Sequence, residues 1–288
     1  MPAAQTIVDA VLAWYPDHAR DLPWREAGTT PWQVLVSEVM LQQTPVARVI
    51  EPYRAWIGRW PTPTTLAAED SSAAVAAWGR LGYPRRAVRL HAAASQVTTR
   101  HGGELPAELD QLRRLPGVGE YTAAAVYSFG FHGRAVVLDT NIRRLLGRLD
   151  AGIASPTDHI VAAERARAIQ YLPEDPRTAS RWSVAVMELG ALVCTAASPR
   201  CSVCPVAGQC TWRMAGYPPG PKPRRPGFQG SDRQCRGQLL EVIRHRGETP
   251  VQVVLASWAD ADQAVRSLQG LANDGLVHLS TDGQRVRL

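Results

Sequence analysis

Apolar residues recur three and four positions apart along most of the chain, which is the spacing of one face of an α-helix. The N-terminal segment has this spacing and no basic opening stretch, so we expect an amphipathic helix there rather than a signal peptide. A loop over residues 21–30 follows, and a second helix is predicted from Pro31. Its apolar stripe consists of Trp32, Leu35, Val36, Val39 and Met40.

Helices with short breaks are predicted through the middle of the chain. Between residues 52 and 100, the spacing predicts helices over 66–81 and 86–97, joined by a tight turn, LGYPRR, at 81–86. Two more helices are expected within residues 156–190. The segment YLPEDPR separates them, because its two prolines interrupt helical hydrogen bonding. The stripe of the second of these helices is Trp182, Val186 and Leu189.

A glycine-containing turn at residues 115–119, LPGVG, lies between two helical patterns, residues 106–114 and 122–130. Gly117 and Gly119 provide the positive φ or close backbone approach that other residues resist. The turn leaves unpaired backbone N–H groups at a helix N-terminus, which is a place to hold a phosphate. The spacing alone fits an ordinary helical hairpin equally well.

A short apolar run at residues 133–138 is predicted to be extended, and a helix is predicted to begin after it. Asp139, Thr140 and Asn141 open this helix, and aspartate is a good N-cap residue. A structural capping role for Asp139 is therefore one interpretation. The helix carries its apolar stripe on Ile142, Leu145, Leu146 and Leu149.

The C-terminal part of the chain differs in composition. Residues 215–234 are rich in proline, glycine and arginine and are predicted to be a linker. Helices are expected over 236–246, 249–257 and 259–273, followed by a two-stranded hairpin with an Asp-Gly turn. This order suggests a winged-helix module, whose third helix either reads DNA or simply packs as part of an extra domain.

The overall expectation is an all-α fold with two helical domains and a small winged-helix-like module. The expected divisions are a six-helix domain (23–136), a second helical domain that contains Cys194 to Cys210 (1–22 with 137–214), a linker (215–234) and the winged-helix-like module (235–288). A chain of 288 residues is long enough for two or three domains.

Composition and charge narrow the class of protein. Hydrophobic residues make up 45% and charged residues 20% of the chain, and no apolar run approaches ~20 residues, so no membrane span is expected. We expect a cytoplasmic, nucleoid-associated protein. The net charge of +6 favours a polyanion as partner, although a basic balance alone is weak evidence. Lys222 is the only lysine, and every other cation is arginine.

Four cysteines form a compact C-x6-C-x2-C-x5-C motif at Cys194, Cys201, Cys204 and Cys210. In a cytoplasmic protein such a group is more often a metal site than a pair of disulfides. Four thiolates suit either structural zinc or a [4Fe–4S] cluster, but zinc sites usually pair two C-x2-C motifs. Cys235 stands apart and is expected to be a lone thiol.

Two stretches resemble a known family. LPGVGxxTAxA followed by VxDxNxxRxxxR is similar to the helix-hairpin-helix, Gly/Pro-plus-Asp signature of the DNA glycosylase superfamily. LPWR and SEVMLQQT are similar to the opening segment of the adenine DNA glycosylases, the MutY family. The resemblance covers roughly residues 18–212. It implies a [4Fe–4S] cluster on the four cysteines, whose spacing is the one found in this family and in the endonuclease III family.

The resemblance also implies roles for individual residues. Glu38, of SEVMLQQT, would be the general acid that protonates adenine, and Asp139 would stabilise the sugar of the flipped nucleotide. Glu38 lies between Val34 and Leu41 on its helix, and apolar neighbours raise a carboxyl pKa toward neutrality. Taken alone, Glu38 would pass as a solvated surface residue. The other residues implied in catalysis or in binding substrate and DNA are Tyr121, Asn141, Arg25, Gln42, Gln43, Tyr83, Gly117, Val118, Gly119 and Glu188.

The implied function is excision of adenine opposite 8-oxoguanine or guanine in double-stranded DNA, by a monomer that flips the base out of the helix. Gln43 would fill the gap in the base stack. Two alternatives remain open: a thymine or uracil glycosylase acting on G mismatches, and a non-catalytic iron–sulfur DNA-binding protein. Relatives of the first kind typically lack the glutamate of SEVMLQQT, so Glu38 argues against it.

Two positions, Tyr121 and Pro84, differ from residues that relatives carry, whereas Glu188 follows the family pattern. Endonuclease III-like lyases carry a lysine where this chain has Tyr121, so a monofunctional glycosylase is expected. Pro84 replaces a second tyrosine that many relatives carry after Tyr83, which weakens the expectation of intercalation there. Glu188 is expected to contact the flipped adenine, with a solvent-facing glutamate as the alternative. Members of the family commonly carry a larger Nudix-like C-terminal domain that recognises 8-oxoguanine, and the chain is expected to lack it.

Overall fold

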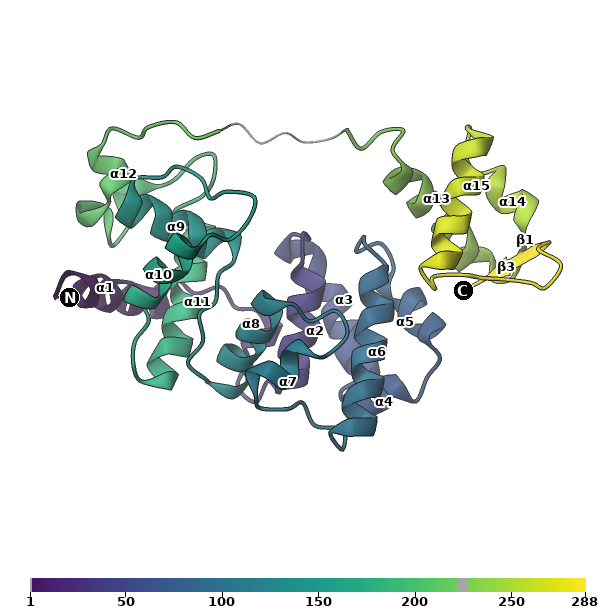
Figure 1. Ribbon diagram of the computed structural model, residues 1–288, viewed down its shortest axis with the longest axis horizontal. Coiled ribbons are helices and arrows are strands. Elements are labelled where there is room, and N and C mark those ends of the chain that lie inside the picture. Colours follow the sequence, from purple (N-terminus) through teal and green to yellow (C-terminus); the bar gives the residue numbers. More distant parts are fainter. Residues whose placement is uncertain (1, 222–226) are drawn as a thin grey trace. The chain divides into compact units, whose positions relative to one another are not determined.

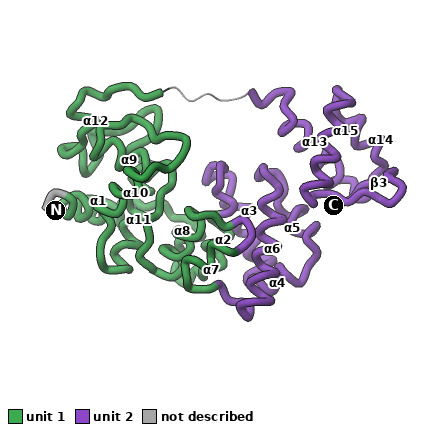
Figure 2. Tube along the Cα trace, viewed as in Figure 1, with its two compact units in different colours: residues 1–38, 106–114, 118–223 green, residues 39–105, 115–117, 224–288 purple. Residues whose placement is uncertain are grey.

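The computed structural model describes residues 2–221 and 227–288, and its regular structure is mostly helical (Figure 1). The predicted all-α fold class is therefore confirmed. The chain divides into two compact units, which Figure 2 colours separately. The first unit comprises residues 1–38, 106–114 and 118–223, and the second comprises residues 39–105, 115–117 and 224–288.

The first unit consists of helices and short 3₁₀ turns, and the last three residues of α2 belong to the second unit. Their bounds are α1 Pro2–His18, η1 Pro23–Arg25, α2 Pro31–Leu41, α7 Leu109–Arg113, α8 Glu120–Phe131, α9 Thr140–Ala151, α10 Ala162–Gln170, α11 Pro176–Leu192, η2 Cys201–Val203, η3 Ala207–Gln209 and α12 Thr211–Met214. The predicted helices at the N-terminus, from Pro31 and after Asp139 are confirmed.

The core of the first unit forms around α11, which packs against α1, α8 and α9. The stripe predicted from the sequence, Trp182, Val186 and Leu189, is buried in this core. Asp175 caps α11 by accepting a hydrogen bond from the Thr178 N–H. These contacts hold the N-termini of α8 and α9 in one folded unit, where the candidate site lies.

The glycine turn joins α7 to α8, as predicted. Gly117 has φ +77°, and a Cβ there would lie 2.8 Å from the Cβ of Arg89, so the position requires glycine. The same prediction is wrong for Gly119, which has φ −87° as the N-cap of α8 and open space where a Cβ would be. The helix expected over residues 106–114 begins only at Leu109, because Glu108 has an extended backbone.

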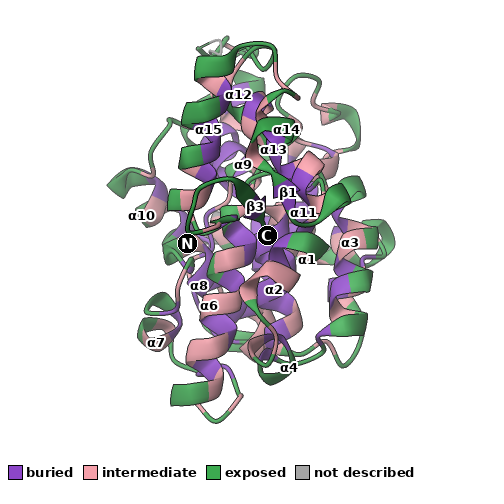
Figure 3. Cartoon of the chain, turned by 90° about the vertical axis from the view of Figure 1, so that its right-hand side faces the viewer, coloured by how far each residue is buried: buried purple, intermediate pink, exposed green. Residues whose placement is uncertain are grey.

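The second unit contains helices, short strands and a cluster of three tryptophans, Trp56, Trp60 and Trp78, whose rings meet edge to face. Figure 3 shows its helix α6 with buried residues along one stripe. The single helix predicted over residues 66–81 is wrong, because the Asp70 side chain accepts from the Ser72 N–H and starts a new helix. The helices before the linker are α3 Val46–Arg59, α4 Pro63–Ala67, α5 Ser71–Trp78 and α6 Arg85–Arg100.

The C-terminal segment of the second unit mixes helices and strands. They are α13 Asp232–Arg246, β1 Thr249–Pro250, α14 Val251–Leu255, α15 Ala261–Asn273, β2 His278–Leu279 and β3 Arg285–Arg287. The antiparallel sheet has the order β1-β3-β2, so the predicted hairpin is confirmed and β1 is an addition. The helix expected from Arg236 begins earlier, at Asp232, because the Ser231 side chain caps it. Cys235 is a buried free thiol, as expected.

Within the described residues, no helix combines the length and the apolar character needed to cross a membrane. Lys222 lies outside the described residues.

Candidate active site

Glu38 is a buried carboxyl on α2, with 7% of its surface exposed. Its neighbour on the same flank, Val34, is also buried, so the alternative of a solvated surface glutamate is wrong. The Tyr121 hydroxyl, on α8, donates a hydrogen bond to Glu38 Oε2 at 2.8 Å. Burial is the main cause that raises the pKa of Glu38 to about 7, and the hydrogen bond from Tyr121 partly opposes it.

Asp139 caps the N-terminus of α9. Its Oδ1 accepts from the Ile142 N–H at 2.7 Å, and its Oδ2 accepts from Asn141 Nδ2 at 2.6 Å. Burial raises the pKa of Asp139 above its ordinary value, whereas these hydrogen bonds and the charge of Arg144 lower it. The capping role is therefore real, and it leaves open a second role for the same carboxylate.

Glu38, Tyr121 and Asp139 lie near enough to act on one another electrostatically. After burial, the charges of Glu38 and Asp139 raise the pKa of Tyr121, and the charge of Asp139 also raises that of Glu38. The phenol therefore stays protonated and remains a hydrogen-bond donor. Three elements distant in sequence, α2, α8 and the start of α9, bring these groups together within the first unit.

Glu188 lies fully buried on α11 between two arginines. Arg20 donates to Oε1 from its backbone N–H (3.0 Å) and from Nε (2.7 Å), and to Oε2 from Nη2 (2.8 Å). Arg25 Nη2 also donates to Oε2, at 2.9 Å. Burial alone would raise the pKa of Glu188, but the two arginines lower it to about 2. The solvent-facing alternative for Glu188 is wrong.

Arg25 has one hydrogen-bond donor that its contact with Glu188 does not use. Its Nη1 is buried and has no hydrogen-bond partner among the described residues. The positive charge of Arg25 lowers the pKa of Glu38, which puts the guanidinium within electrostatic range of that carboxyl. A buried unpaired donor costs free energy unless a ligand satisfies it, so this nitrogen is a candidate contact for a bound base.

Arg144 connects the aspartate to the cysteine segment, a link that our sequence analysis missed. Its Nη2 donates to Asn141 Oδ1 at 2.8 Å and to the Gly190 carbonyl at 2.7 Å, and its Nε donates to the Cys194 carbonyl at 2.7 Å. The VxDxNxxRxxxR motif contains this arginine three residues after Asn141. Helical spacing at i, i+3 was the signal that places the two side chains together.

The four motif cysteines are free and line one pocket. Arg148 Nη1 donates to Cys194 Sγ at 3.4 Å, and the same guanidinium lies 4.3 Å from the Trp212 ring. Val193 and Trp212 give the pocket apolar walls. No group of three or more His, Cys, Asp or Glu side chains in the described ranges is arranged to hold a metal ion.

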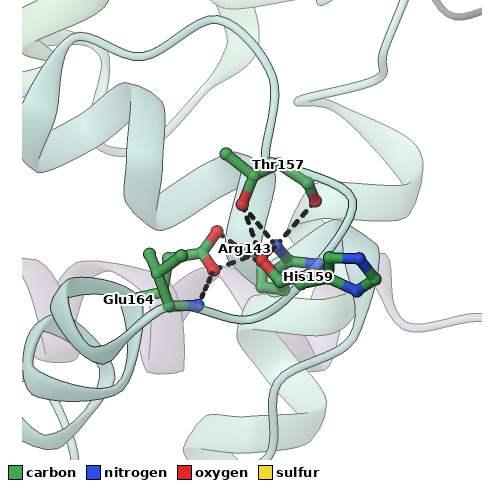
Figure 4. A network of polar contacts seen from close by, with 5 residues as sticks. Arg143, Thr157, His159 and Glu164 are labelled. Atoms are coloured by element: carbon green, nitrogen blue, oxygen red, sulfur yellow. Dashed lines mark hydrogen bonds and ion pairs between the residues drawn. The ribbon is translucent and has the colours of Figure 1, made fainter.

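A second buried network is centred on Arg143 of α9 (Figure 4). Its guanidinium pairs with Glu164 at 2.9 Å and donates to the Thr157 and His159 carbonyls at 2.8 and 2.9 Å. Both charged side chains are 8% exposed. The network ties the segment between α9 and α10 to the helix that carries Asp139.

The remaining predicted residues lie around the turns. Gln43 and Tyr83, in the second unit, both have positive φ, 54° and 48°, and Tyr83 is 42% exposed. The carbonyl of Gln42 accepts a hydrogen bond from Arg86. Val118 is buried, and Gly117 and Gly119 flank it in the turn before α8.

A glycine turn between helices, followed by an aspartate at the start of the next helix, defines the class of protein. Residues 36–170 match the HhH-GPD superfamily of base excision DNA repair proteins. The chain is 48% identical over 285 residues to the adenine DNA glycosylase of Mycobacterium tuberculosis, covering 95% of this chain and 91% of that protein. The chain therefore belongs to the adenine DNA glycosylase family.

Two further comparisons involve glycosylases that are named for other bases. The chain is 36% identical over 203 residues to the thymine/uracil-DNA glycosylase of Pyrobaculum aerophilum, covering 69% of this chain and 87% of that protein. Its fold is similar to the solved structure of a thermostable thymine-DNA glycosylase, with a TM-score of 0.65, 23% identity, and coverage of 74% of this chain and 97% of that one. The second similarity bears on the fold alone.

Proposed function

We propose that this chain is a DNA glycosylase that hydrolyses the N-glycosidic bond of adenine mispaired with 8-oxoguanine or guanine. The observation that supports the proposal most is that two carboxyls distant in sequence, the buried Glu38 and the half-buried Asp139, both lie within electrostatic range of the Tyr121 hydroxyl. The adenine DNA glycosylase of M. tuberculosis, at 48% identity, supports adenine as the base. An adenine inside a duplex must first be flipped out, at a cost of a few kcal/mol.

In this proposal, Glu38 is the general acid. A carboxyl with a pKa of about 7 is partly protonated at neutral pH and delivers its proton readily. Because Tyr121 donates to Oε2, Oε1 is the oxygen that would carry the proton to the purine N7. Protonation makes adenine a better leaving group, and the C1′–N9 electron pair departs with the base.

Asp139 would stabilise the positive charge that develops on the sugar. Its two hydrogen bonds, from Ile142 and Asn141, and the charge of Arg144 favour the carboxylate against the effect of burial. Water then adds to C1′ and gives up a proton, which the Asp139 carboxylate accepts. Most enzymes that cleave glycosidic bonds use two carboxyl groups, one protonated and one ionised.

Arg25 and Glu188 would bind the flipped base. The unpaired Arg25 Nη1 supports a direct contact with a ring nitrogen acceptor. Both oxygens of Glu188 accept hydrogen bonds from arginines, which supports a role in holding Arg25 and Arg20. A direct contact between Glu188 and adenine stays a prediction, and it requires one of these hydrogen bonds to open.

Double-stranded DNA would be held by the turn before α8 and by the turns that carry Gln43 and Tyr83. Open space beside Gly119 at the start of α8, together with the N–H groups of Gly117 and Val118, suits a backbone phosphate. Gln42 and Gln43 would fill the gap left in the base stack. We expect the protein to act as a monomer.

Tyr121 supports a monofunctional reaction. Strand cleavage through a Schiff base needs an amine, and Tyr121 is a phenol whose pKa is raised by burial and by the neighbouring carboxyls. Borohydride trapping on abasic DNA tests this point. The proposal predicts little covalent adduct, whereas strong trapping would indicate a lyase.

We also propose that the four cysteines hold a [4Fe–4S] cluster. Such a cluster is larger than an ion and takes one thiolate at each iron, which suits four thiols arranged around one pocket. The N–H of Arg148 on Cys194 Sγ, and the nearby charge of Arg144, would balance the negative thiolates. When bound, the cluster would supply a structural cross-link of the segment between α11 and α12.

The predicted domain boundaries remain part of the proposal. The order α13, β1, α14, α15, β2, β3, with β1 added to the hairpin, supports a winged-helix module after the linker.

Base excision from duplexes that differ in one pair tests the proposed substrate. Single-turnover assays would compare A:8-oxoG, A:G, A:C, T:G and U:G. We expect adenine to be released opposite 8-oxoguanine and guanine, and no release of thymine or uracil. Release of thymine or uracil would favour the alternative suggested by the P. aerophilum relative.

A further inference from the structure

Arg86, in the first turn of α6, is a buried arginine with only 7% of its surface exposed. Burial lowers its pKa to about 10, so it still carries a charge at neutral pH. Within residues 2–221 and 227–288, it forms no ion pair with a carboxylate; its hydrogen bonds go to main-chain carbonyls and to one hydroxyl. A buried charge without a counter-ion is costly, so the contacts that it makes need an explanation.

One set of contacts secures the end of α2. Arg86 Nη1 donates to the carbonyls of Val39 (2.8 Å), Met40 (3.2 Å) and Gln42 (2.6 Å). Helix C-termini have carbonyls without intrahelical donors and favour a cation. Nη2 adds a hydrogen bond to Thr44 Oγ1 at 3.2 Å, so the guanidinium holds the segment on both sides of Gln43.

The other set of contacts secures the turn before α6. Arg86 Nη2 donates to the Gly82 carbonyl at 2.9 Å, and Nε donates to the Tyr83 carbonyl at 3.4 Å. The guanidinium also lies 5.4 Å from the centre of the Tyr83 ring. One side chain therefore joins two turns that are about 40 residues apart in sequence.

Both turns hold a non-glycine residue at positive φ. Gln43 has φ 54° and Tyr83 has φ 48°, a conformation that L-residues resist and that persists only where the surroundings impose it. Arg86 bonds to the backbone beside both residues. A planar guanidinium with five donors can do this, whereas a lysine ammonium is a single point charge with three.

We propose that Arg86 is a positioning residue that holds the Gln43 and Tyr83 turns in their strained shapes before DNA binds, so that both side chains can enter the base stack as adenine leaves it. This inference rests on the proposed function for the base-flipping step. None of the contacts described above involves Glu38, Tyr121 or Asp139. Arg86 therefore acts on extrusion of the base and not on cleavage of the bond. Ordering a flexible turn on binding costs conformational entropy. Turns that are already ordered in the free protein avoid this loss when DNA binds.

The test separates extrusion from cleavage. It uses a duplex with 2-aminopurine opposite guanine and the full chain with Asp139→Asn, a change that the proposed function expects to block cleavage. 2-Aminopurine is an adenine analogue whose fluorescence rises when it leaves the stack. Arg86→Lys is expected to reduce the rate of the fluorescence rise about 10- to 100-fold, with less than about a threefold change in DNA affinity. Arg100→Lys, an exposed change on the same helix, is the matched control and should have no effect.

Melting temperatures accompany each variant. If Arg86→Lys melts below the assay temperature, Thr44→Val replaces it, because this change removes one acceptor of Arg86 and leaves the arginine in place. A slower rise of roughly severalfold is then expected. Extrusion at the rate of the parent protein in a folded Arg86→Lys or Thr44→Val variant would overturn the inference. Failure of the protein without substitutions to release adenine would instead overturn the proposed function.

Discussion

Glu38 is buried and Asp139 is half-buried, and their neighbours favour different protonation states. Glu38 has apolar neighbours and accepts one hydrogen bond from a phenol. Asp139 accepts from a helix N–H and from an amide, and lies within range of the Arg144 charge. Since burial raises both pKa values, these donors make Asp139 the better candidate for the ionised partner.

The excision rate should depend on pH through Glu38. With a pKa of about 7, the carboxyl is mostly protonated below that pH and ionised above it. We expect the single-turnover rate to fall about tenfold for each pH unit above about 7, because a general acid must hold its proton. A rate that stays constant from pH 6 to pH 9 would contradict this role.

Stability should depend on pH through the same residue, with a definite sign. A carboxyl whose pKa is raised by folding, from 4.5 to about 7, binds its proton more tightly in the folded state. Its contribution is therefore present below about pH 4.5 and is lost as the pH rises through 7, by up to about 3 kcal/mol.

Glu38→Gln should remove this loss, so the variant should gain stability relative to the parent protein above pH 7. Urea unfolding at pH 5 and pH 8.5 measures the difference. Glu51→Gln, at a glutamate whose side chain is 81% exposed, is the control and should show no such change. The difference in free energy of unfolding between the parent protein and Glu38→Gln should therefore change with pH. The same difference at pH 5 and at pH 8.5 would contradict the burial of an ionisable carboxyl.

At the scale of single elements, α9 carries most of the connections of the site. Asp139 caps it, Asn141 lies in its first turn, and Arg144 and Arg148 reach the Cys194 segment from later turns. Arg143 ties the same helix to Glu164. A change in the cysteine segment should therefore alter the position of Asp139 and its hydrogen bonds.

Replacing Arg144 tests this connection. Arg144→Met removes the hydrogen bonds to Asn141 and to the Gly190 and Cys194 carbonyls, so Asn141 loses the group that orients it. We expect a loss of about tenfold or more in single-turnover rate, with a smaller loss for Arg144→Lys. Arg181→Met, at an exposed position of α11, should leave the rate unchanged. Equal rates for Arg144→Met and Arg181→Met would show that the connection is not used.

Elements with clear periodicity were predictable from the sequence, whereas short or capped ones were not. The stripe on α11 and the cap at Asp139 identified their helices correctly. The break before α5 depends on one side-chain cap at Asp70, and β1 is a two-residue strand with no periodicity to detect. Local spacing contains no information on such features.

The candidate site, too, could be predicted only in part from the sequence, for a different reason. Glu38 and Asp139 were identified through motifs, but Arg20 and Arg86 were not, because their partners lie far away in sequence. Arg20 binds Glu188, which is 168 residues away, and Arg86 binds carbonyls that carry no sequence signature. Tertiary contacts of this kind become visible only in the folded chain.

For the whole molecule, the chemistry is divided between two units. The first unit contains the paired carboxyls and the cysteine pocket, and the second contains the Gln43 and Tyr83 turns and the C-terminal helices and strands. The proposed cluster should be important for the first unit as a whole, because Arg144 and Arg148 on α9 both contact Cys194.

Purified protein is expected to contain about four iron and four sulfide per chain and to absorb visible light accordingly. Cys201→Ser should lower the iron content and the melting temperature together, while Cys235→Ser should leave the iron content unchanged, since that thiol is buried in α13. Full iron content in Cys201→Ser would contradict the assignment of that ligand.

The central claim is that Glu38 and Asp139 act on one extruded nucleotide. Single-turnover adenine excision from an A:G duplex by Glu38→Gln, Asp139→Asn and the double variant tests it most directly. Each single change should lower the rate about 100-fold or more, and the double variant should lose far less than the product, because the groups act as a unit. Retention of the parent rate by either single variant would contradict the claim.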